Sequence, residues 1–114
     1  MNDFIKVMKA LSDPCRVKIV KMLQRRTMCV CEMREALRIS QPSVSKHLKI
    51  LENAGLIDHR KDGLWVDYFT TDGSRSPYVA SLLGNLRHWM EEEPDIKELI
   101  KRLPLIRRED ICCR

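Results

Sequence analysis

The feature that most constrains this chain is a single β-hairpin signal set among segments of helical periodicity. Asp62-Gly63 lies within a β-prone stretch, residues 56–69, and an Asp-Gly pair flanked in this way is a strong short-range indicator of a hairpin. Elsewhere the apolar residues recur at helical spacing. The sequence therefore predicts a mainly α fold with one small β-hairpin.

Two helices are predicted at the start of the chain. Residues 4–11 have apolar side chains at helical spacing. Asp13 can then cap a second helix that has Pro14 at its first position and an apolar inner face. A polar connection, residues 24–27, follows this second helix.

Two further helices come before the hairpin and are joined by a short turn, residues 38–40. The third helix begins near Cys29, where Glu32 stands three residues on, as in a capping box. Ser40 can cap the fourth. On a helical wheel, one face of the fourth helix is apolar and comprises Val44, Leu48 and Leu51. Two helices joined by a short turn and followed by a hairpin predict a winged helix-turn-helix.

After the hairpin, the pattern predicts a long helix over residues 78–92, broken by Pro94. Its inward residues are expected to be Val79, Leu82, Leu83, Leu86 and either Trp89 or Met90. A short helix, residues 95–103, and a loose tail, residues 104–114, should follow.

We expect two parts in the chain. Residues 1–93 form a DNA-binding and dimerisation domain, and residues 94–114 form a C-terminal short helix and tail with a cysteine pair. The first helix and residues 78–90 carry apolar faces larger than a winged core needs. A homodimer is therefore predicted.

The charge of the chain suits an anionic partner. Its 21 lysines and arginines outnumber 16 acidic residues, which gives a net charge of +5. The candidate DNA-contacting residues on the fourth helix are Gln41, Ser43, Ser45, Lys46 and Lys49, and those at the hairpin tip are Arg60 and Lys61. Serine and glutamine can bond base edges, and lysine can contact phosphate or guanine. An ordinary solvated surface is the alternative. His47 is predicted to be a hydrogen-bonded structural residue.

The location of the protein is expected to be cytoplasmic. No apolar run approaches the roughly 18 residues of a membrane helix, and residues 1–11 lack the apolar core of a signal peptide. The five cysteines should then be reduced.

Cys29 and Cys31 lie in the predicted first turn of the third helix. The helix dipole there favours thiolates, and thiolates bind soft metal ions. On a regular helix, residues two apart point about 200° apart, so two such sulfurs could share one ion only if the turn loosened. Two small packing residues are the alternative.

Residues 3–70 resemble the ArsR/SmtB family of metal-sensing repressors. Three segments carry the resemblance: residues 11–20, 39–51 and 60–68. It implies a dimeric repressor that binds double-stranded operator DNA, not RNA. The segment 28–32 resembles the Cys-Val-Cys motif of the arsenite- and antimonite-responsive branch, and a similar motif occurs in the cadmium/lead-responsive branch.

The resemblance leaves the third ligand of As(III) or Sb(III) open. Arg34 stands where the arsenite branch often has another cysteine. Three candidates remain: Cys15, Cys112 and Cys113. The zinc-sensing branch uses a cluster on the last long helix, which His88 and Glu91 match only in part. Pro77 and Arg75 stand at the remaining positions and cannot supply ligands.

An enzyme is disfavoured because none of the three histidines stands beside a cysteine in a recognisable nucleophile arrangement, and because no glycine-rich phosphate loop occurs. The same fold could instead answer oxidants or sulfide through a Cys29–Cys31 or Cys112–Cys113 disulfide. It could also be a constitutive DNA-binding or interaction module whose cysteines are irrelevant.

Overall fold

The computed structural model describes residues 1–111. The elements in chain order are α1 (Asn2–Ala10), α2 (Pro14–Arg25), α3 (Val30–Leu37), α4 (Gln41–Asn53), β1 (Ile57–Asp62), β2 (Trp65–Thr70), α5 (Pro77–Leu86), α6 (Pro94–Arg102), the 3-10 turn η1 (Leu103–Leu105) and α7 (Arg108–Ile111). This order confirms a mainly α fold with one hairpin. Within residues 1–111, no helix has the length and apolar character needed to span a membrane.

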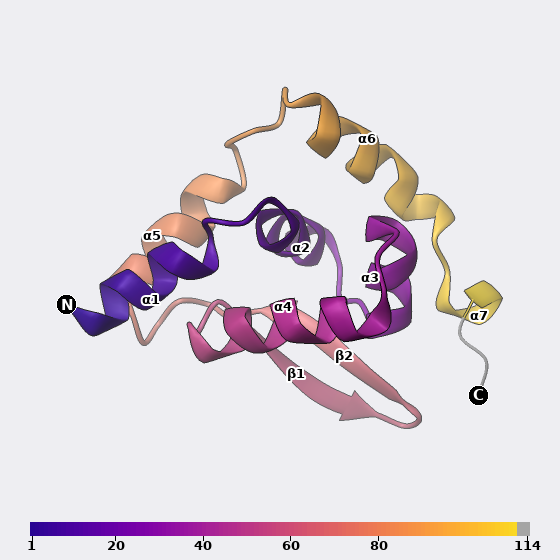
Figure 1. Ribbon diagram of the computed structural model, residues 1–114, viewed down its shortest axis with the longest axis horizontal. Coiled ribbons are helices and arrows are strands. Elements are labelled where there is room, and N and C mark those ends of the chain that lie inside the picture. Colours follow the sequence, from indigo (N-terminus) through magenta and orange to yellow (C-terminus); the bar gives the residue numbers. More distant parts are fainter. Residues whose placement is uncertain (112–114) are drawn as a thin grey trace.

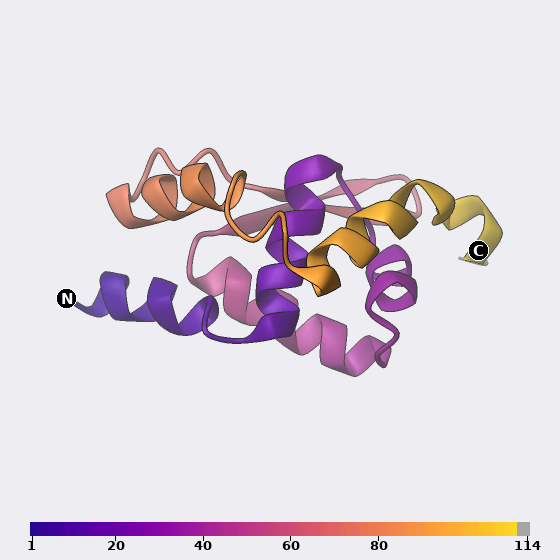
Figure 2. The ribbon, with the colours of Figure 1, turned by 90° about the horizontal axis from the view of Figure 1, so that it is seen from above.

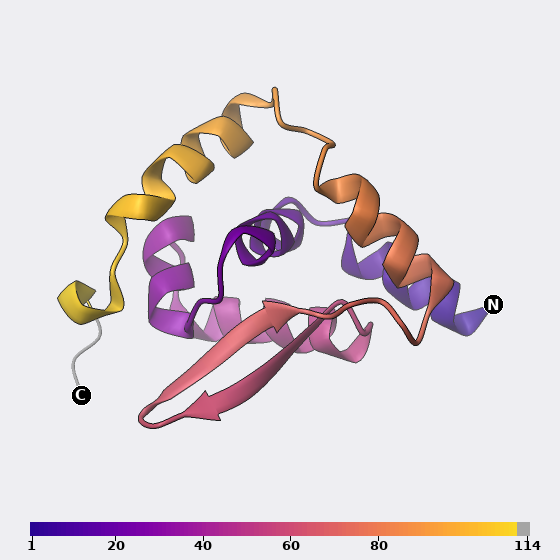
Figure 3. The ribbon, with the colours of Figure 1, turned by 180° about the vertical axis from the view of Figure 1, so that it is seen from behind.

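Helix α2 lies at the centre of the molecule (Figure 1). Helices α3 and α4 and the hairpin surround it on one side, and α6 passes over the opposite side, as Figure 3 also shows. Helices α1 and α5 lie side by side at one end, and α7 lies at the other (Figure 2). The core is built on α2, whose Ile19, Val20 and Met22 are fully buried.

The predicted helix caps before α2 and α4 are confirmed. The carboxylate of Asp13 accepts a hydrogen bond from the backbone N–H of Arg16 at 3.1 Å. The hydroxyl of Ser40 accepts one from the N–H of Ser43 at 3.3 Å. The predicted apolar face of α4 is also confirmed, because its three members are buried: Val44, Leu48 and Leu51.

The hairpin is confirmed, but its turn lies one residue further on than the Asp-Gly pair suggested. Asp62 pairs with Trp65 across the strands, so the two-residue loop is Gly63-Leu64. Gly63 has φ +64°, and the hairpin turns that match strand twist need a positive φ at their first loop residue. Gly63 therefore sets the register of this hairpin, which is the wing of the winged helix-turn-helix.

Helix α5 is shorter than the predicted helix over 78–92, because it ends at Leu86. The buried ammonium of Lys21 donates hydrogen bonds to the carbonyls of Leu86 (2.6 Å) and Trp89 (2.8 Å). A cation at a helix C-terminus satisfies carbonyls that have no partner inside the helix. Met90 then takes a positive φ and packs on the core, whereas Trp89 is half exposed. The chain turns here toward α6.

Residues 94–111, which we call the C-terminal strap, are ordered into α6, η1 and α7. The short helix predicted over 95–103 is confirmed, but the prediction of a loose tail is wrong for residues 104–111. Leu99, Leu103 and Ile106 are buried in the same core as α2 and α3, which holds the strap in place. Cys112 and Cys113 lie outside the described residues.

Candidate thiol site and DNA-facing surface

Cys29 is the N-cap residue of α3, and Cys31 is the second residue of that helix. Both cysteines therefore lie at the start of α3, as predicted. The side chain of Cys29 is buried, with 4% of its surface exposed, and Cys31 is half-buried. Cys29 has an extended backbone (φ −94°, ψ 171°). The expected angle of about 200° between the two side chains applies only to residues inside a helix, so the cap and its hydrogen bonds set the direction of Cys29.

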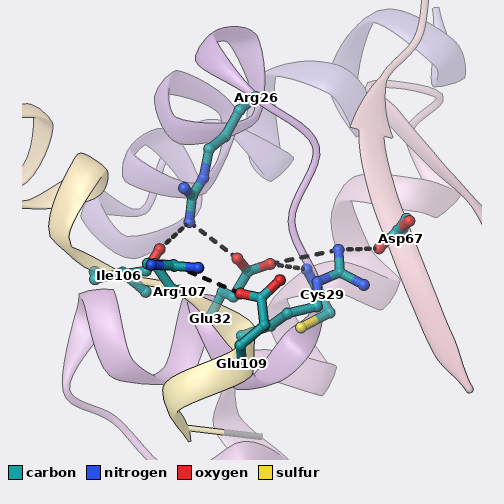
Figure 4. A network of polar contacts seen from close by, with 8 residues as sticks. Arg26, Cys29, Glu32, Asp67, Ile106, Arg107 and Glu109 are labelled. Carbon is teal, nitrogen blue, oxygen red and sulfur yellow. Dashed lines mark hydrogen bonds and ion pairs between the residues drawn. The ribbon is translucent and has the colours of Figure 1, made fainter.

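Glu32 stabilises the start of α3, residues 29–32, which we call the cysteine turn. Its carboxylate accepts a hydrogen bond from the backbone N–H of Cys29 at 2.9 Å, which is the capping-box contact that the sequence predicts. Although charged, Glu32 is only 5% exposed. Arg26 donates to it at 3.0 Å, and Arg108 lies 3.8 Å away. Figure 4 shows the carboxylate between Arg26 and Cys29.

Two arginines connect this turn to the strap and the wing. Arg26 donates a second hydrogen bond to the carbonyl of Ile106 at 2.7 Å. Arg108 donates to Asp67 of β2 at 2.6 Å, and its guanidinium lies over the ring of Trp65 at 4.7 Å. Burial alone would lower the pKa of Arg108, but the hydrogen bond and charge of Asp67, with nearby Glu32 and Cys29, raise it overall. Arg108 thus remains a cation that joins α7, α3 and β2.

A second link joins the cysteine turn directly to the wing. Met28, the residue before Cys29, forms a two-residue antiparallel bridge with Tyr68 of β2. The N–H of Met28 donates to the Tyr68 carbonyl at 3.2 Å, and the Tyr68 N–H donates back at 2.8 Å. A displacement of Cys29 would therefore be transmitted to β2 through the backbone as well as through Arg108.

Sequence reasoning missed most of this network. Arg108 and Asp67 are 41 residues apart, and Arg26 and Ile106 are 80 apart. The only signal in the sequence was Glu32, through its capping-box position. No local pattern marks Arg26, Asp67 or Arg108 as members.

The structure does not bring Cys15 of the same chain to the Cys29/Cys31 pair. Cys15 is in the first turn of α2, and Cys29 lies beyond the other end of that twelve-residue helix, which is about 18 Å long. Within residues 1–111, neither sulfur of the pair belongs to a group of three His, Cys, Asp or Glu ligand atoms. The other two candidates, Cys112 and Cys113, lie outside the described part of the chain. Arg34 is exposed.

The elements that carry the predicted DNA-contacting residues lie on one side of the molecule. Helix α4 and the hairpin both run along the lower side in Figures 1 and 3. The exposed members are Gln41, Ser45, Lys46, Lys49, Arg60 and Lys61. Ser43 is half-buried and accepts a hydrogen bond from the Ser40 hydroxyl at 3.0 Å. The guanidinium of Arg60 lies over the Phe69 ring at 5.2 Å.

Two of the histidines, His47 and His88, lie near residues that the sequence singled out. His47 is half-buried, and its Nδ1 lies 3.3 Å from Nη1 of Arg16, which confirms the predicted hydrogen-bonded role. His88 follows the end of α5. Glu91 forms ion pairs with Lys21 and Arg25, so its carboxylate is already engaged. The hydrogen bond and charge of Lys21 lower the pKa of Glu91.

Comparisons with known proteins agree with this architecture. The model of the bacterial regulatory protein arsR family matches residues 13–59. The arsenical resistance operon repressor of Escherichia coli K12 is 32% identical over 102 residues, covering 87% of this chain and 83% of that protein. A cadmium resistance transcriptional regulatory protein CadC homolog of Staphylococcus aureus is 41% identical over 71 residues, covering 61% of this chain and 59% of that protein.

A solved structure shows the same fold. The homodimeric winged helix-turn-helix DNA-binding domain of Mb0332 from Mycobacterium bovis superposes with a TM-score of 0.65 at 23% identity, covering 80% of this chain and 81% of that one. The alignment with the E. coli relative covers most of both chains, and the family model covers the helix-turn-helix itself. The chain therefore belongs to the ArsR family of bacterial regulatory proteins, DNA-binding transcriptional regulators with a winged helix-turn-helix.

Proposed function

We propose that this protein is a cytoplasmic repressor that binds double-stranded operator DNA as a homodimer and releases it when As(III) or Sb(III) binds Cys29 and Cys31. The observation that carries the proposal is the position of Cys29. The turn that it begins is joined to wing strand β2 twice, through the Met28–Tyr68 bridge and through the chain Glu32–Arg108–Asp67. A ligand at Cys29 thus acts on a DNA-reading element.

The DNA-binding part of the proposal rests on α4 and the wing. Lys46 and Lys49 are exposed on α4, and Lys61 is exposed on β1, where cations can contact phosphates. Gln41 and Ser45 are exposed and can reach base edges. The wing thus extends a surface that starts on α4, which is the recognition helix of this proposal.

Lys46→Ala tests this surface. Losing one phosphate contact should weaken binding to all sequences and flatten the salt dependence by roughly one unit of slope. Lys101→Ala is the matched control, because Lys101 is exposed on α6, across α2 from α4. The measurement is operator affinity at several salt concentrations. Equal effects of the two variants would contradict this docking of α4.

The homodimer rests on the apolar surface of α1 and α5. Phe4, Ile5 and Met8 of α1 are exposed, and so is Tyr78 of α5. The rings of Phe4 and Tyr78 pack edge to face, with centroids 5.3 Å apart, so the two helices present one continuous apolar surface. The homodimer of Mb0332 supports the same assembly here. Two symmetric recognition helices would read half-sites about one helical turn, or a multiple of it, apart.

The release step follows from the burial of Cys29. Coordination of an ion by Cys29 and the half-buried Cys31 requires the Cys29 side chain to leave its packed position. That movement strains the hydrogen bond from its N–H to Glu32 and the adjacent bridge at Met28. A hundredfold loss of DNA affinity needs about 2.7 kcal/mol of coupling, which thiolate bonds to the ion can supply. Water, a small thiol, or Cys112 or Cys113 would complete the site.

Two alternatives keep the same fold and change the signal. The first is Cd(II) or Pb(II) at the same two thiolates, and the similarity to the cadmium resistance CadC homolog supports Cd(II). The second is a disulfide formed by an oxidant. The disulfide would join either Cys29 to Cys31 or Cys112 to Cys113, so the identity of the inducer has to come from titration.

An operator-release assay tests the proposal. Wild-type protein on labelled operator is titrated with arsenite, antimonite, Cd(II), Pb(II) and peroxide in parallel. Cys29→Ser/Cys31→Ser should bind DNA normally, because serine also caps helices well, and should lose release by arsenite. Cys112→Ser/Cys113→Ser is the matched control and should lose less. Normal arsenite release by the Cys29→Ser/Cys31→Ser protein would contradict the proposal.

A further inference from the structure

Residues 1–111 contain a second group of metal-ligating side chains, remote from Cys29. Ligand atoms of Asp13, Cys15 and His47 all lie within 4.8 Å of one another, and all three residues are half-buried. Asp13 and Cys15 stand at the start of α2, whereas His47 projects from the middle of α4. The other such group, Glu52, Asp58 and His59, lies mostly on exposed surface and has no sulfur.

We propose that Asp13, Cys15 and His47 form a binding site for a borderline divalent cation, Zn(II) above all, which would tie the start of α2 to the recognition helix. One sulfur, one imidazole nitrogen and one carboxylate oxygen form a donor set that Zn(II) accepts, with a fourth position left for water. As(III) prefers several thiolates, so this site would not compete for the ion proposed at Cys29.

The spacing of the ligands is close to what such an ion needs. The bond lengths of tetrahedral Zn(II) place its ligand atoms about 3.3–3.8 Å apart. Asp13 Oδ2 and His47 Nδ1 are 3.9 Å apart, and every pair in the group is within 4.8 Å. Rotamer changes that shorten these distances by at most about 1.5 Å would therefore complete the site. Asp13 and a Cys15 thiolate would also balance the charge of the ion.

Arg16 is the competing cation, and its contacts leave room for the ion. A guanidinium can only donate, so Nδ1 of His47 accepts from Arg16 Nη1 and its lone pair lies on the side of Arg16 and Asp13. This is the tautomer that a metal requires at Nδ1. Arg16 is held independently by hydrogen bonds from Nε to the Ala10 carbonyl (2.7 Å) and from Nη2 to the Lys9 carbonyl (3.3 Å). Only the hydrogen bond between Arg16 Nη1 and His47 Nδ1 has to break before Nδ1 can bind the ion.

Co(II) binding to a protein with Cys15 as its single thiol tests the site. The full chain carrying Cys29→Ser, Cys31→Ser, Cys112→Ser and Cys113→Ser removes every other sulfur that could be mistaken for this one. A thiolate-to-cobalt charge-transfer band should appear, saturate at one Co(II) per chain and disappear when excess Zn(II) is added. Because the proposed arsenite site is absent from this protein, the result does not depend on the proposed function.

Single changes in this background assign the ligands. Cys15→Ser should abolish the band, and His47→Gln and Asp13→Asn should each weaken Co(II) binding at least tenfold. Glu52→Gln, in the other group, is the matched control and should leave it unchanged. The thermal midpoint of each metal-free variant shows that it is folded, and only Cys15-containing protein with an intact site should gain stability with Zn(II). No band with excess Co(II), or an unchanged band in His47→Gln, would overturn the site.

Discussion

Helices α2 and α3 both have a cysteine in or next to their first turn, but the two turns are held differently. At α3, Cys29 is buried, and Glu32 bonds its N–H while also pairing with Arg26 and with Arg108 of the strap. At α2, Asp13 caps the helix by bonding a backbone N–H three residues on, and Cys15 is only half-buried.

The difference shows how far each turn depends on the rest of the fold. The α2 cap spans three residues of chain. The α3 turn is bonded to Arg26, which follows α2, and through Arg108 of the strap to Asp67 of β2, so under the proposed function a change at Cys29 would reach the wing. The α2 turn can hold a ligand without such an effect on β2.

The largest difference should come from neutralising the acid in each turn. Glu32→Gln keeps the shape of the side chain but weakens its bonds to two arginines, and we expect a loss of about 3 kcal/mol in the free energy of unfolding. Asp13→Asn should cost only a few tenths of a kcal/mol, because asparagine caps helices as well as aspartate. Urea denaturation of both variants measures this. Similar losses would remove the contrast.

Removing Arg108 from the strap should loosen the α3 turn and its contact with β2, but not the first turn of α2. Arg108→Gln takes away the partner of buried Asp67 and the second cation near Glu32, and should cost about 2 kcal/mol. Hydrogen exchange should become faster at the amides of residues 29–33 and Tyr68. The first turn of α2 should exchange as before, and faster exchange there would show that the two turns are coupled.

Acid should weaken the packing of the segment after α5 on α2 through Glu91, which pairs with Lys21 and Arg25. The pKa of Glu91 is lowered, first by its hydrogen bond with Lys21, so its ion pairs stabilise the native state above the ordinary glutamate pKa of about 4.3. That stabilisation is lost as pH falls through the lower native value. Glu91→Gln should therefore be less stable than wild type at pH 7, with a gap that narrows as pH falls below the ordinary glutamate pKa of about 4.3. Stability measured against pH for both proteins checks this, and a constant gap would contradict it.

The smallest effect is expected from Cys15 in the arsenite response. Cys15→Ser should release operator DNA at the same arsenite concentration as wild type, because α2 separates Cys15 from Cys29. The release assay described for Cys29 measures it, with Cys29→Ser as the positive control. A clear shift in Cys15→Ser would indicate that Cys15 reaches the thiol pair of the other protomer.

The sequence by itself determined the elements whose signals are local. The caps at Asp13 and Ser40, the capping-box role of Glu32 and the apolar face of α4 all depend on residues three or four positions apart, and helix geometry fixes those contacts. The hairpin was also found, although pairing across the strands moved its turn to Gly63-Leu64. Because the capping-box signal is local, the sequence also placed both cysteines at the start of α3.

Only the tertiary structure decided where α5 ends, how the strap docks and what surrounds each cysteine. Lys21 ends α5 by bonding the carbonyl of Leu86, 65 residues away, and His47 meets Arg16 across 31 residues. Arg108 reaches Asp67 across 41. No periodicity encodes such contacts, because a buried charge is stable only where distant elements happen to bring it an opposite charge or a backbone carbonyl. The position of the cysteine turn could therefore be predicted from the sequence, but its connection to the wing could not.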